Sequence, residues 1–152
     1  MSPLDVAVVG YGFSAKIFHL PFIRHSPGFR LHAIVQRTPR SDDNPEKDFP
    51  GVRVYRGAYN AIHDEEVDVL MITSTNDSHF PFSRDALEKG KHVIAERPFT
   101  VSYAEAVELV DLAAEKNKQL AVYHTQGCGF GDALIELCRR SAVQGRTVTV
   151  DL

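Results

Sequence analysis

The chain has 152 residues, of which 43% are hydrophobic and 24% are charged, and its formal net charge at pH 7 is −3. A chain of this size buries roughly 70% of the surface of its unfolded state, so we expect one domain with a hydrophobic core. The net charge is negative and no run of Lys and Arg is longer than a pair, which excludes a basic protein that binds nucleic acid.

Cysteine usage and hydropathy indicate the compartment. The two cysteines, Cys128 and Cys138, suggest reduced thiols rather than a disulfide framework or a metal site. The N-terminal residues enter an apolar strand pattern at once, which leaves no room for a signal peptide. No apolar run approaches about 18 residues, so no membrane span is expected. These features predict a soluble, cytoplasmic protein.

Short apolar runs alternate with helical patterns along the whole chain. The runs predict strands at 6–10, 30–35, 52–55, 67–73, 92–96 and 119–124. Several runs are apolar on both faces, as a covered parallel sheet requires. The regular succession of strand and helix predicts an α/β fold with a doubly wound parallel sheet, the Rossmann arrangement that binds NAD(P).

Helices are predicted at 14–24, 79–90, 102–117 and 131–145. In the first of these, Pro21 is expected to kink or end the helix. Ser78 is expected to cap the second, and Ser102 with Glu105 forms a capping box at the start of the third. The polar, proline-bearing stretch 37–51 is predicted to be a loop.

A glycine-rich loop follows the first predicted strand. Residues 10–15, GYGFSA, match the pattern G-x-G-x-x-G/A between a strand and a helix. The first glycine permits a tight turn, the second lets a pyrophosphate approach the backbone, and the alanine keeps the helix close to the sheet. The predicted contacts with a dinucleotide are Gly10, Gly12, Phe13, Ser14 and Ala15. The alternative is a glycine turn that joins strand to helix and binds nothing.

The residues after the second strand indicate which dinucleotide binds. An NAD-binding chain shows Asp or Glu here to hold the ribose 2′-hydroxyl, whereas this chain has Gln36, Arg37 and Thr38, with Arg40 nearby. A guanidinium pairs with a 2′-phosphate, so NADP is favoured over NAD. The alternative is that Arg37 and Arg40 are solvated loop residues.

Four segments, at 10–23, 67–93, 95–100 and 120–146, resemble the Gfo/Idh/MocA family of oxidoreductases. The resemblance implies an N-terminal Rossmann domain followed by a larger α/β domain with an open antiparallel sheet. The chain stops where the first strand of that second sheet is expected. We therefore expect a Rossmann domain at 1–145, and at 146–152 the first strand of a C-terminal domain that the chain lacks.

The resemblance also implies which residues surround the nicotinamide and the substrate. The residues that match the family's cofactor-lining segment are Thr73, Ser74, Thr75, Asn76 and His79. Glu96, Arg97 and Pro98 stand where the family has Glu-Lys-Pro, whose lysine contacts substrate and assists proton transfer.

The candidate catalytic residues are Arg97, Glu96 and His124. A guanidinium keeps its charge, so Arg97 is expected to anchor a carboxylate or polarise a carbonyl rather than act as a general acid. The alternative is that Glu96 and Arg97 fix the loop and pair with neighbours. His124, after the sixth strand, is the remaining candidate proton carrier at this end of the sheet.

These features predict an NADP-dependent oxidoreductase that passes hydride between nicotinamide and a carbonyl or hydroxyl of a small substrate. Two alternatives are a cofactor-binding or regulatory module without redox chemistry and a small acid/base enzyme, such as a lyase or cyclase, that uses the same cleft. The last residues, 147–152, alternate as an unpaired strand with Val148 and Val150 on one face, which predicts a homodimer through this strand.

Overall fold

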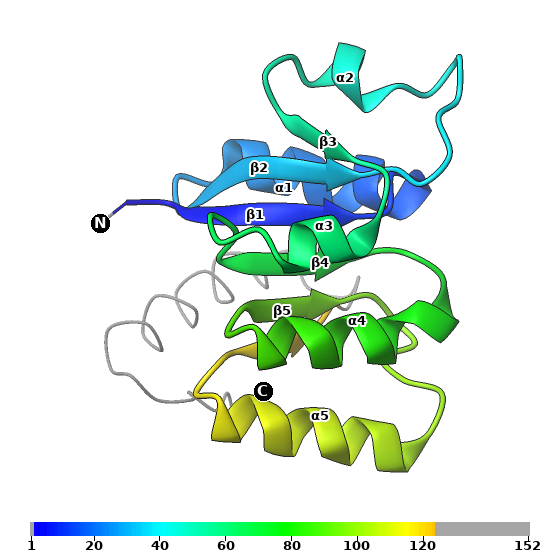
Figure 1. Ribbon diagram of the computed structural model, residues 1–152. Coiled ribbons are helices and arrows are strands. Elements are labelled where there is room, and N and C mark those ends of the chain that lie inside the picture. The colour runs from blue at the N-terminus through cyan, green and yellow to red at the C-terminus, as the bar shows by residue number, and fades with distance from the viewer. Residues whose placement is uncertain (1, 124–152) are drawn as a thin grey trace.

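The computed structural model describes residues 2–123, which form a six-stranded parallel sheet with helices on both faces (Figure 1). The strands are β1 (Leu4–Val9), β2 (Phe29–Val35), β3 (Arg53–Tyr55), β4 (Val69–Ile72), β5 (His92–Ala95) and β6 (Leu120–Val122). Each lies within two residues of a predicted strand. The predicted α/β class and the parallel sheet are confirmed.

The order of the strands determines where a ligand can bind. Across the sheet the order is β3-β2-β1-β4-β5-β6, and every paired neighbour runs parallel. The chain winds outward in one direction from β1 to β3 and in the other from β4 to β6, so the connections diverge between β1 and β4. In sheets of this type, ligands bind in the crevice outside the carboxyl ends of the strands at that point.

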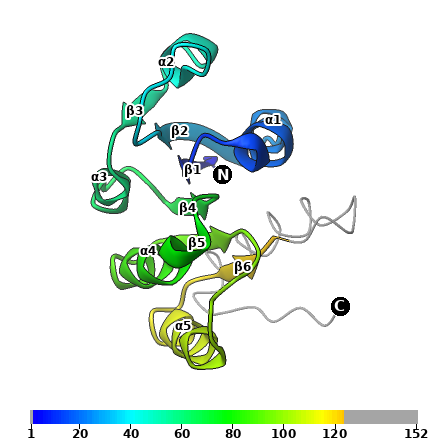
Figure 2. The same cartoon turned by 90° about the vertical axis from the view of Figure 1, so that its right-hand side faces the viewer.

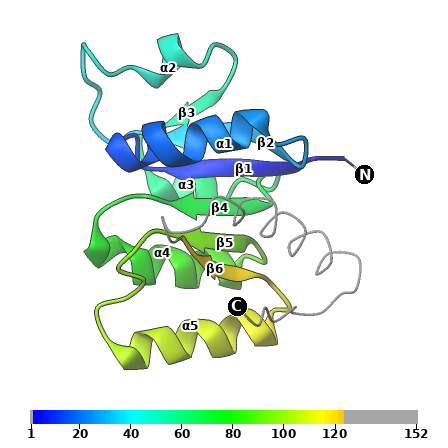
Figure 3. The same cartoon turned by 180° about the vertical axis from the view of Figure 1, so that it is seen from behind.

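Alternate strand residues supply two hydrophobic cores, one on each face of the sheet. Ala7 and Val9 of β1 pack beneath one set of helices, and Val6 and Val8 face the opposite side. Figure 2 shows α1 (Leu20–His25) on one face and α3 (Ala58–Ile62), α4 (Asn76–Glu88) and α5 (Tyr103–Glu115) on the other. From behind, α1 lies across β1 and β2 (Figure 3).

Two helix predictions need correction. Helix α4 begins at Asn76 with Thr75 as its N-cap, because Thr75 has an extended backbone conformation, and Ser78 lies within the first turn. Its hydroxyl donates to the Thr75 carbonyl at 2.6 Å instead of capping. Pro21 does not end its helix, which continues to His25. A π-helical turn, η1 (Ala15–His19), directly precedes α1, and Pro21 lies just after this turn within the same continuous helical segment.

The capping box of α5 is confirmed in part. The Ser102 hydroxyl accepts the Glu105 N–H at 3.3 Å, but the Glu105 carboxylate accepts the N–H of Val101 rather than that of Ser102. The predicted loop 37–51 contains a short helix, α2 (Pro45–Asp48), which was not expected. Helix α3 was also not predicted, because five residues carry too little of a helical period to show in the sequence.

The predictions for the C-terminal part lie outside the described residues. They are the helix at 131–145, the strand at 147–151 with its dimer contact, and a catalytic role for His124. Within residues 2–123, no helix combines the length and the apolar character that crossing a bilayer requires.

Candidate functional site

The glycine loop lies where β1 and β4 end side by side. Gly10 has φ of 109°, in the region that only glycine adopts readily. A Cβ at Gly10 would lie 2.9 Å from both the carbonyl oxygen and the Oγ1 of Thr73. Thr73 also holds the loop in place, because its hydroxyl is within hydrogen-bonding distance of the Val9 carbonyl, at 3.1 Å, and of the Gly10 carbonyl, at 3.2 Å. The turn therefore depends on glycine at position 10 and on the hydroxyl at position 73.

The next part of the loop has the form of an anion cradle. A Cβ at Gly12 would meet no atom within 4 Å, so the loop is open on that side. The N–H groups of a helix's first turn have no internal partner, and here they follow Gly12 directly. Ala15 is fully buried, which keeps the helix start against the sheet, while Phe13 is 74% exposed. The loop thus has an open side at Gly12 next to the free N–H groups of a helix start, which are the features that the predicted pyrophosphate contact requires.

Glu96, directly after β5, is hydrogen-bonded to the glycine loop. Its Oε1 accepts the Ser14 hydroxyl and lies 2.8 Å from Nε2 of His19, and its Oε2 accepts the Arg97 N–H at 3.1 Å. His19 is 2% exposed and the Glu96 side chain 12%. The sequence places these residues more than 75 positions apart, so only the fold reveals the contact.

The ionisation of this pair follows from its surroundings. Burial raises the pKa of Glu96, but the hydrogen bonds from Ser14 and His19 outweigh it and the pKa lies below the ordinary value. Burial lowers the pKa of His19 more than Glu96 raises it. The arrangement at neutral pH is an ionised carboxylate that accepts a proton-bearing nitrogen of a neutral imidazole. Glu96 is consequently poorly suited to donate a proton.

His79, which was expected to line the cofactor, instead joins two loops beneath the site. It is 1% exposed; its Nδ1 lies 2.8 Å from the Pro98 carbonyl and its Nε2 lies 3.1 Å from the Ser74 carbonyl. The Arg97–Pro98 peptide bond is cis. The Ser74 hydroxyl pairs with that of Ser78 at 2.6 Å. His79 therefore fixes the segment after β4 relative to the turn after β5.

Among the expected site residues of the segments after β4 and β5, Thr75, Asn76 and Arg97 are exposed. The Arg97 side chain is exposed, and within residues 2–123 no ion pair joins its guanidinium to a carboxylate. Asp77, in the first turn of α4, has its pKa lowered by the Thr75 hydroxyl and by the first-turn backbone, with a further contribution from the charge of Arg37.

The three residues predicted to bind the adenine ribose are in different situations. The Gln36 side chain is buried: its Nε2 donates to the Asp43 carbonyl at 2.7 Å and its Oε1 accepts from Arg56 at 3.2 Å. Arg37 and Thr38 are exposed. Gln36 thus shapes the loop, and Arg37 and Thr38 can reach a ligand.

Sequence reasoning missed Asp43 and Lys16. The bond from Gln36 and a bridge between Arg40 and Asp43 fold the loop back, so that Asp43 forms an ion pair with Lys16 of the first helical turn. The Lys16 ammonium also lies 4.8 Å from the centre of the Tyr11 ring. A carboxylate is therefore present near the glycine loop, although none occurs at the spacing that an NAD site shows in sequence.

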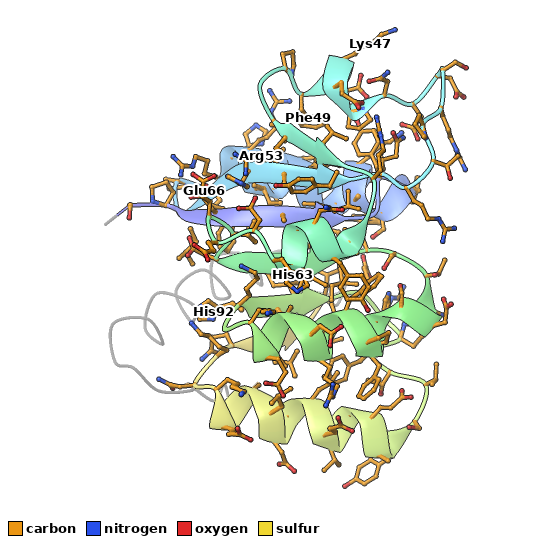
Figure 4. The ribbon with its side chains drawn as sticks, in the orientation of Figure 1. Lys47, Phe49, Arg53, His63, Glu66 and His92 are labelled. Carbon is orange, nitrogen blue, oxygen red and sulfur yellow. The ribbon has the colours of Figure 1, made fainter. Side chains whose placement is uncertain are left out.

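Polar groups also gather at the opposite edge of the sheet, where the strands begin. Ligand atoms of His32, Asp64 and Glu66 all lie within 4.8 Å of one another. Arg53 donates to both carboxylates, at 2.9 Å to Asp64 and 3.1 Å to Glu66, and Figure 4 shows it beside Glu66 at this edge. Tyr55 donates to Asp64 as well. A guanidinium between the carboxylates is unsuited to a cation site, so this cluster is an ion-pair network.

Two hollows among the described residues involve the loop before β4. One, of about 480 Å³, is lined by the loop before β4 and by Lys91 and His92 at the start of β5. Lys91 is buried and donates to the carbonyls of Asp64 and Val67, at 2.7 and 2.8 Å. These hollows are separated from the glycine loop by the length of the strands, and the chemistry expected of a dinucleotide site is not there.

Comparison with known proteins agrees with this geometry. Residues 4–124 match the family model GFO_IDH_MocA, described as an oxidoreductase family with an NAD-binding Rossmann fold. The match covers most of the chain, so the protein belongs to the Gfo/Idh/MocA oxidoreductase family, as its motifs suggested.

Three relatives illustrate the range of the family. An uncharacterized oxidoreductase of Escherichia coli, YdgJ, is 38% identical over 124 residues, which is 81% of this chain and 35% of that protein. The scyllo-inositol 2-dehydrogenase (NADP(+)) IolW of Bacillus subtilis is 28% identical, over 81% of this chain and 34% of its own length. The crystal structure of a Synechocystis biliverdin reductase, in complex with biliverdin and NADP⁺, superposes with a TM-score of 0.72 at 31% identity, over 80% of this chain and 38% of that one. The chain thus spans about a third of the length of these relatives.

Proposed function

We propose that this chain binds NADP in the crevice between β1 and β4 and forms the cofactor-binding part of an oxidoreductase. The reaction would pass hydride between nicotinamide and a carbonyl or hydroxyl of a small substrate. The observation that carries the proposal is the pair of glycines: Gly10 is packed against Thr73, whereas Gly12 opens onto free space at the start of a helix. A turn that only joined strand to helix has no need of that open side.

NADP is favoured over NAD because the end of β2 offers the exposed guanidinium of Arg37 and no carboxylate directly after the strand. A 2′-phosphate carries about two negative charges, and a guanidinium binds it through paired hydrogen bonds. Two of the relatives, IolW and the Synechocystis reductase, are named with NADP. Asp43 is the residue that argues for NAD, because its carboxylate lies near the loop; its pairing with Lys16 offsets that charge.

The chain's own residues have separate tasks in this proposal. The backbone from Gly12 to Ser14 binds the pyrophosphate, and Thr75 and Asn76 line the nicotinamide side. When bound, the nicotinamide supplies the hydride. Arg97, exposed and permanently charged, orients the substrate and polarises its carbonyl oxygen.

The test is a fluorescence titration of the purified chain with NADPH and NADH. NADPH should bind at least tenfold more tightly, and Arg37→Ala should weaken NADPH by about tenfold, or about 1.4 kcal/mol, without changing NADH. Arg84→Ala serves as the matched control, because Arg84 is an exposed arginine that pairs with Glu108 on the helical layer. Asp43→Asn should leave NADH unchanged if Asp43 only pairs with Lys16.

The outcomes separate the possible functions. Equal affinities for NADPH and NADH in the wild type would refute the preference for NADP. A loss of NADH binding in Asp43→Asn would show that Asp43 does more than pair with Lys16. No binding of either dinucleotide would refute the proposed function and favour a module or enzyme without redox chemistry. Binding without turnover on a panel of aldehydes and ketones would assign the chain a cofactor-binding role alone.

A further inference from the structure

A single buried carboxylate connects the two segments that the proposed function requires. Glu96 belongs to the turn after β5, and its main chain is anchored to the sheet by an N–H bond to the Ile72 carbonyl at 2.9 Å. Its side chain reaches across to Ser14 of the glycine loop and to His19 of the π-helical turn. The next residue along the chain is Arg97. The pyrophosphate loop and the substrate-side arginine are thus joined through one side chain.

Most of the acceptor sites of the Glu96 carboxylate are occupied by groups of the chain itself. Oε1 faces two donors and Oε2 accepts the N–H of Arg97, and the side chain is 12% exposed. A hydrogen bond to a charged group contributes more than a neutral one, and a buried donor that loses its partner is costly. Movement of the glycine loop away from the turn would therefore leave Ser14 and His19 with unpaired donors.

The π-helical turn is what brings His19 into this network. Residues Ala15–His19 have one extra residue in the turn, and Leu20 N–H bonds to the Ala15 carbonyl. Such turns are rare in helices and occur often at functional sites. His19 is held on its other side by the edge of the Tyr123 ring, with the ring centres 4.4 Å apart. The imidazole is consequently fixed in one orientation toward Glu96.

We propose that Glu96 is a positioning residue, which holds the pyrophosphate loop and the Arg97 turn in one fixed relation through Ser14 and His19. This positioning role is proposed in place of the catalytic role that the sequence suggested for Glu96. The inference rests on the proposed function for its ligand, a dinucleotide, but the coupling between the two segments exists without one. Loosening either end of the network therefore loosens both.

The test combines amide hydrogen exchange of the free protein with NADPH titration. Glu96→Gln keeps the shape of the side chain but replaces one carboxylate oxygen by an NH₂ group. That group cannot accept a hydrogen bond from Ser14, His19 or the Arg97 N–H, the three donors that the carboxylate faces. Exchange should become at least tenfold faster both in the peptide 10–19 and in the peptide 96–101, with helix α5 unchanged. Ser14→Ala, altered only at the loop, should likewise accelerate exchange at 96–101.

In the titration, Glu96→Gln and Ser14→Ala should each weaken NADPH about tenfold, and the double variant should be no weaker than the single ones. Ser14→Thr, which restores the hydroxyl, should recover most of the affinity. Asp64→Asn is the matched control, because it alters a many-bonded carboxylate at the far edge of the sheet and should leave NADPH affinity unchanged.

The two proposals fail in different ways. If the wild type does not bind NADPH but Glu96→Gln loosens both peptides, the positioning role stands and the proposed function is wrong. If exchange rises only next to the substituted residue, or if the two substitutions weaken NADPH additively, the positioning role is refuted whatever the protein binds.

Discussion

The two glycines of the loop should respond to substitution in opposite ways. Gly10→Ala places a Cβ 2.9 Å from the Thr73 carbonyl oxygen and hydroxyl, a separation that real Cβ atoms do not show, and forces alanine into φ of 109°. Strained backbone of this kind costs about 1–3 kcal/mol, and the contact lies on backbone that the sheet holds in place. We expect a loss of about 2–4 kcal/mol of unfolding free energy.

Gly12→Val should leave stability almost unchanged. Its Cβ meets no atom within 4 Å, and its φ lies outside the positive region. The added side chain instead occupies the space in which a pyrophosphate would approach the backbone. We expect NADPH binding to be abolished while the melting temperature stays within about 3 °C of the wild type.

The assay is thermal unfolding followed by circular dichroism, with NADPH titration of each folded variant. For a domain of this size, 1 kcal/mol corresponds to about 2–4 °C, so Gly10→Ala should melt roughly 5–15 °C lower than the wild type. Equal stability of Gly10→Ala would show that Thr73 moves aside, which contradicts the packing described above. Undiminished NADPH binding by Gly12→Val would show that the open side of the loop is not the ligand site.

Substitutions at three further positions test the packing at some distance from the crevice. Burial lowers the pKa of His92 to about 4, so the unfolded chain binds a proton below about pH 6.5 that the folded chain does not, and stability should fall by about 3 kcal/mol from pH 6.5 to pH 4 through this group. His92→Asn keeps an acceptor for the N–H of Gln119 and should flatten that slope in urea titrations; an unchanged slope would rule out His92 as its source. Asp64→Asn should cost about 1–2 kcal/mol in urea unfolding, because one oxygen of the acceptor becomes a donor, and no loss would mean that the network is dispensable. Ser102→Ala should cost about 1 kcal/mol and Ser102→Asp almost nothing, whereas equal melting of the two variants would contradict capping of the Glu105 N–H.

The parts of the fold that the sequence predicts are those set by local patterns. The apolar runs of β1 and β4 have both faces buried, and such runs indicate a covered parallel strand whatever its neighbours are. The glycine loop was predicted for a similar reason, since its spacing between strand and helix is itself the signal. The start of α4 was not, because Ser74, Thr75 and Ser78 are all acceptable caps by residue type and only the extended backbone at Thr75 decides among them.

The site was less predictable because its contacts join distant segments. Nothing in the sequence near Glu96 indicates that its carboxylate meets Ser14 and His19, which arrive through the pairing of β1, β4 and β5. Asp43 was missed because it lies seven residues after Gln36 in a loop that folds back, held by the hydrogen bond from the Gln36 side chain to the Asp43 carbonyl. The spacing of residues along a loop does not determine their position in space. The permanent charge of Arg97, by contrast, followed from residue type alone.

The polar residues at the crevice fall into two groups with different consequences for specificity. Ser14, Thr73, His79 and Glu96 have their hydrogen-bonding groups bound by other parts of the chain. A buried polar group is costly unless it is paired, so substitution of these residues costs stability or order before it alters recognition. The second group consists of Arg37, Thr38, Thr75, Asn76 and Arg97, which are exposed. If the chain binds a dinucleotide as proposed, the first group fixes the backbone that faces the pyrophosphate. The choice between NADP and NAD and the fit of a substrate would then depend on the second group, whose side chains are exposed.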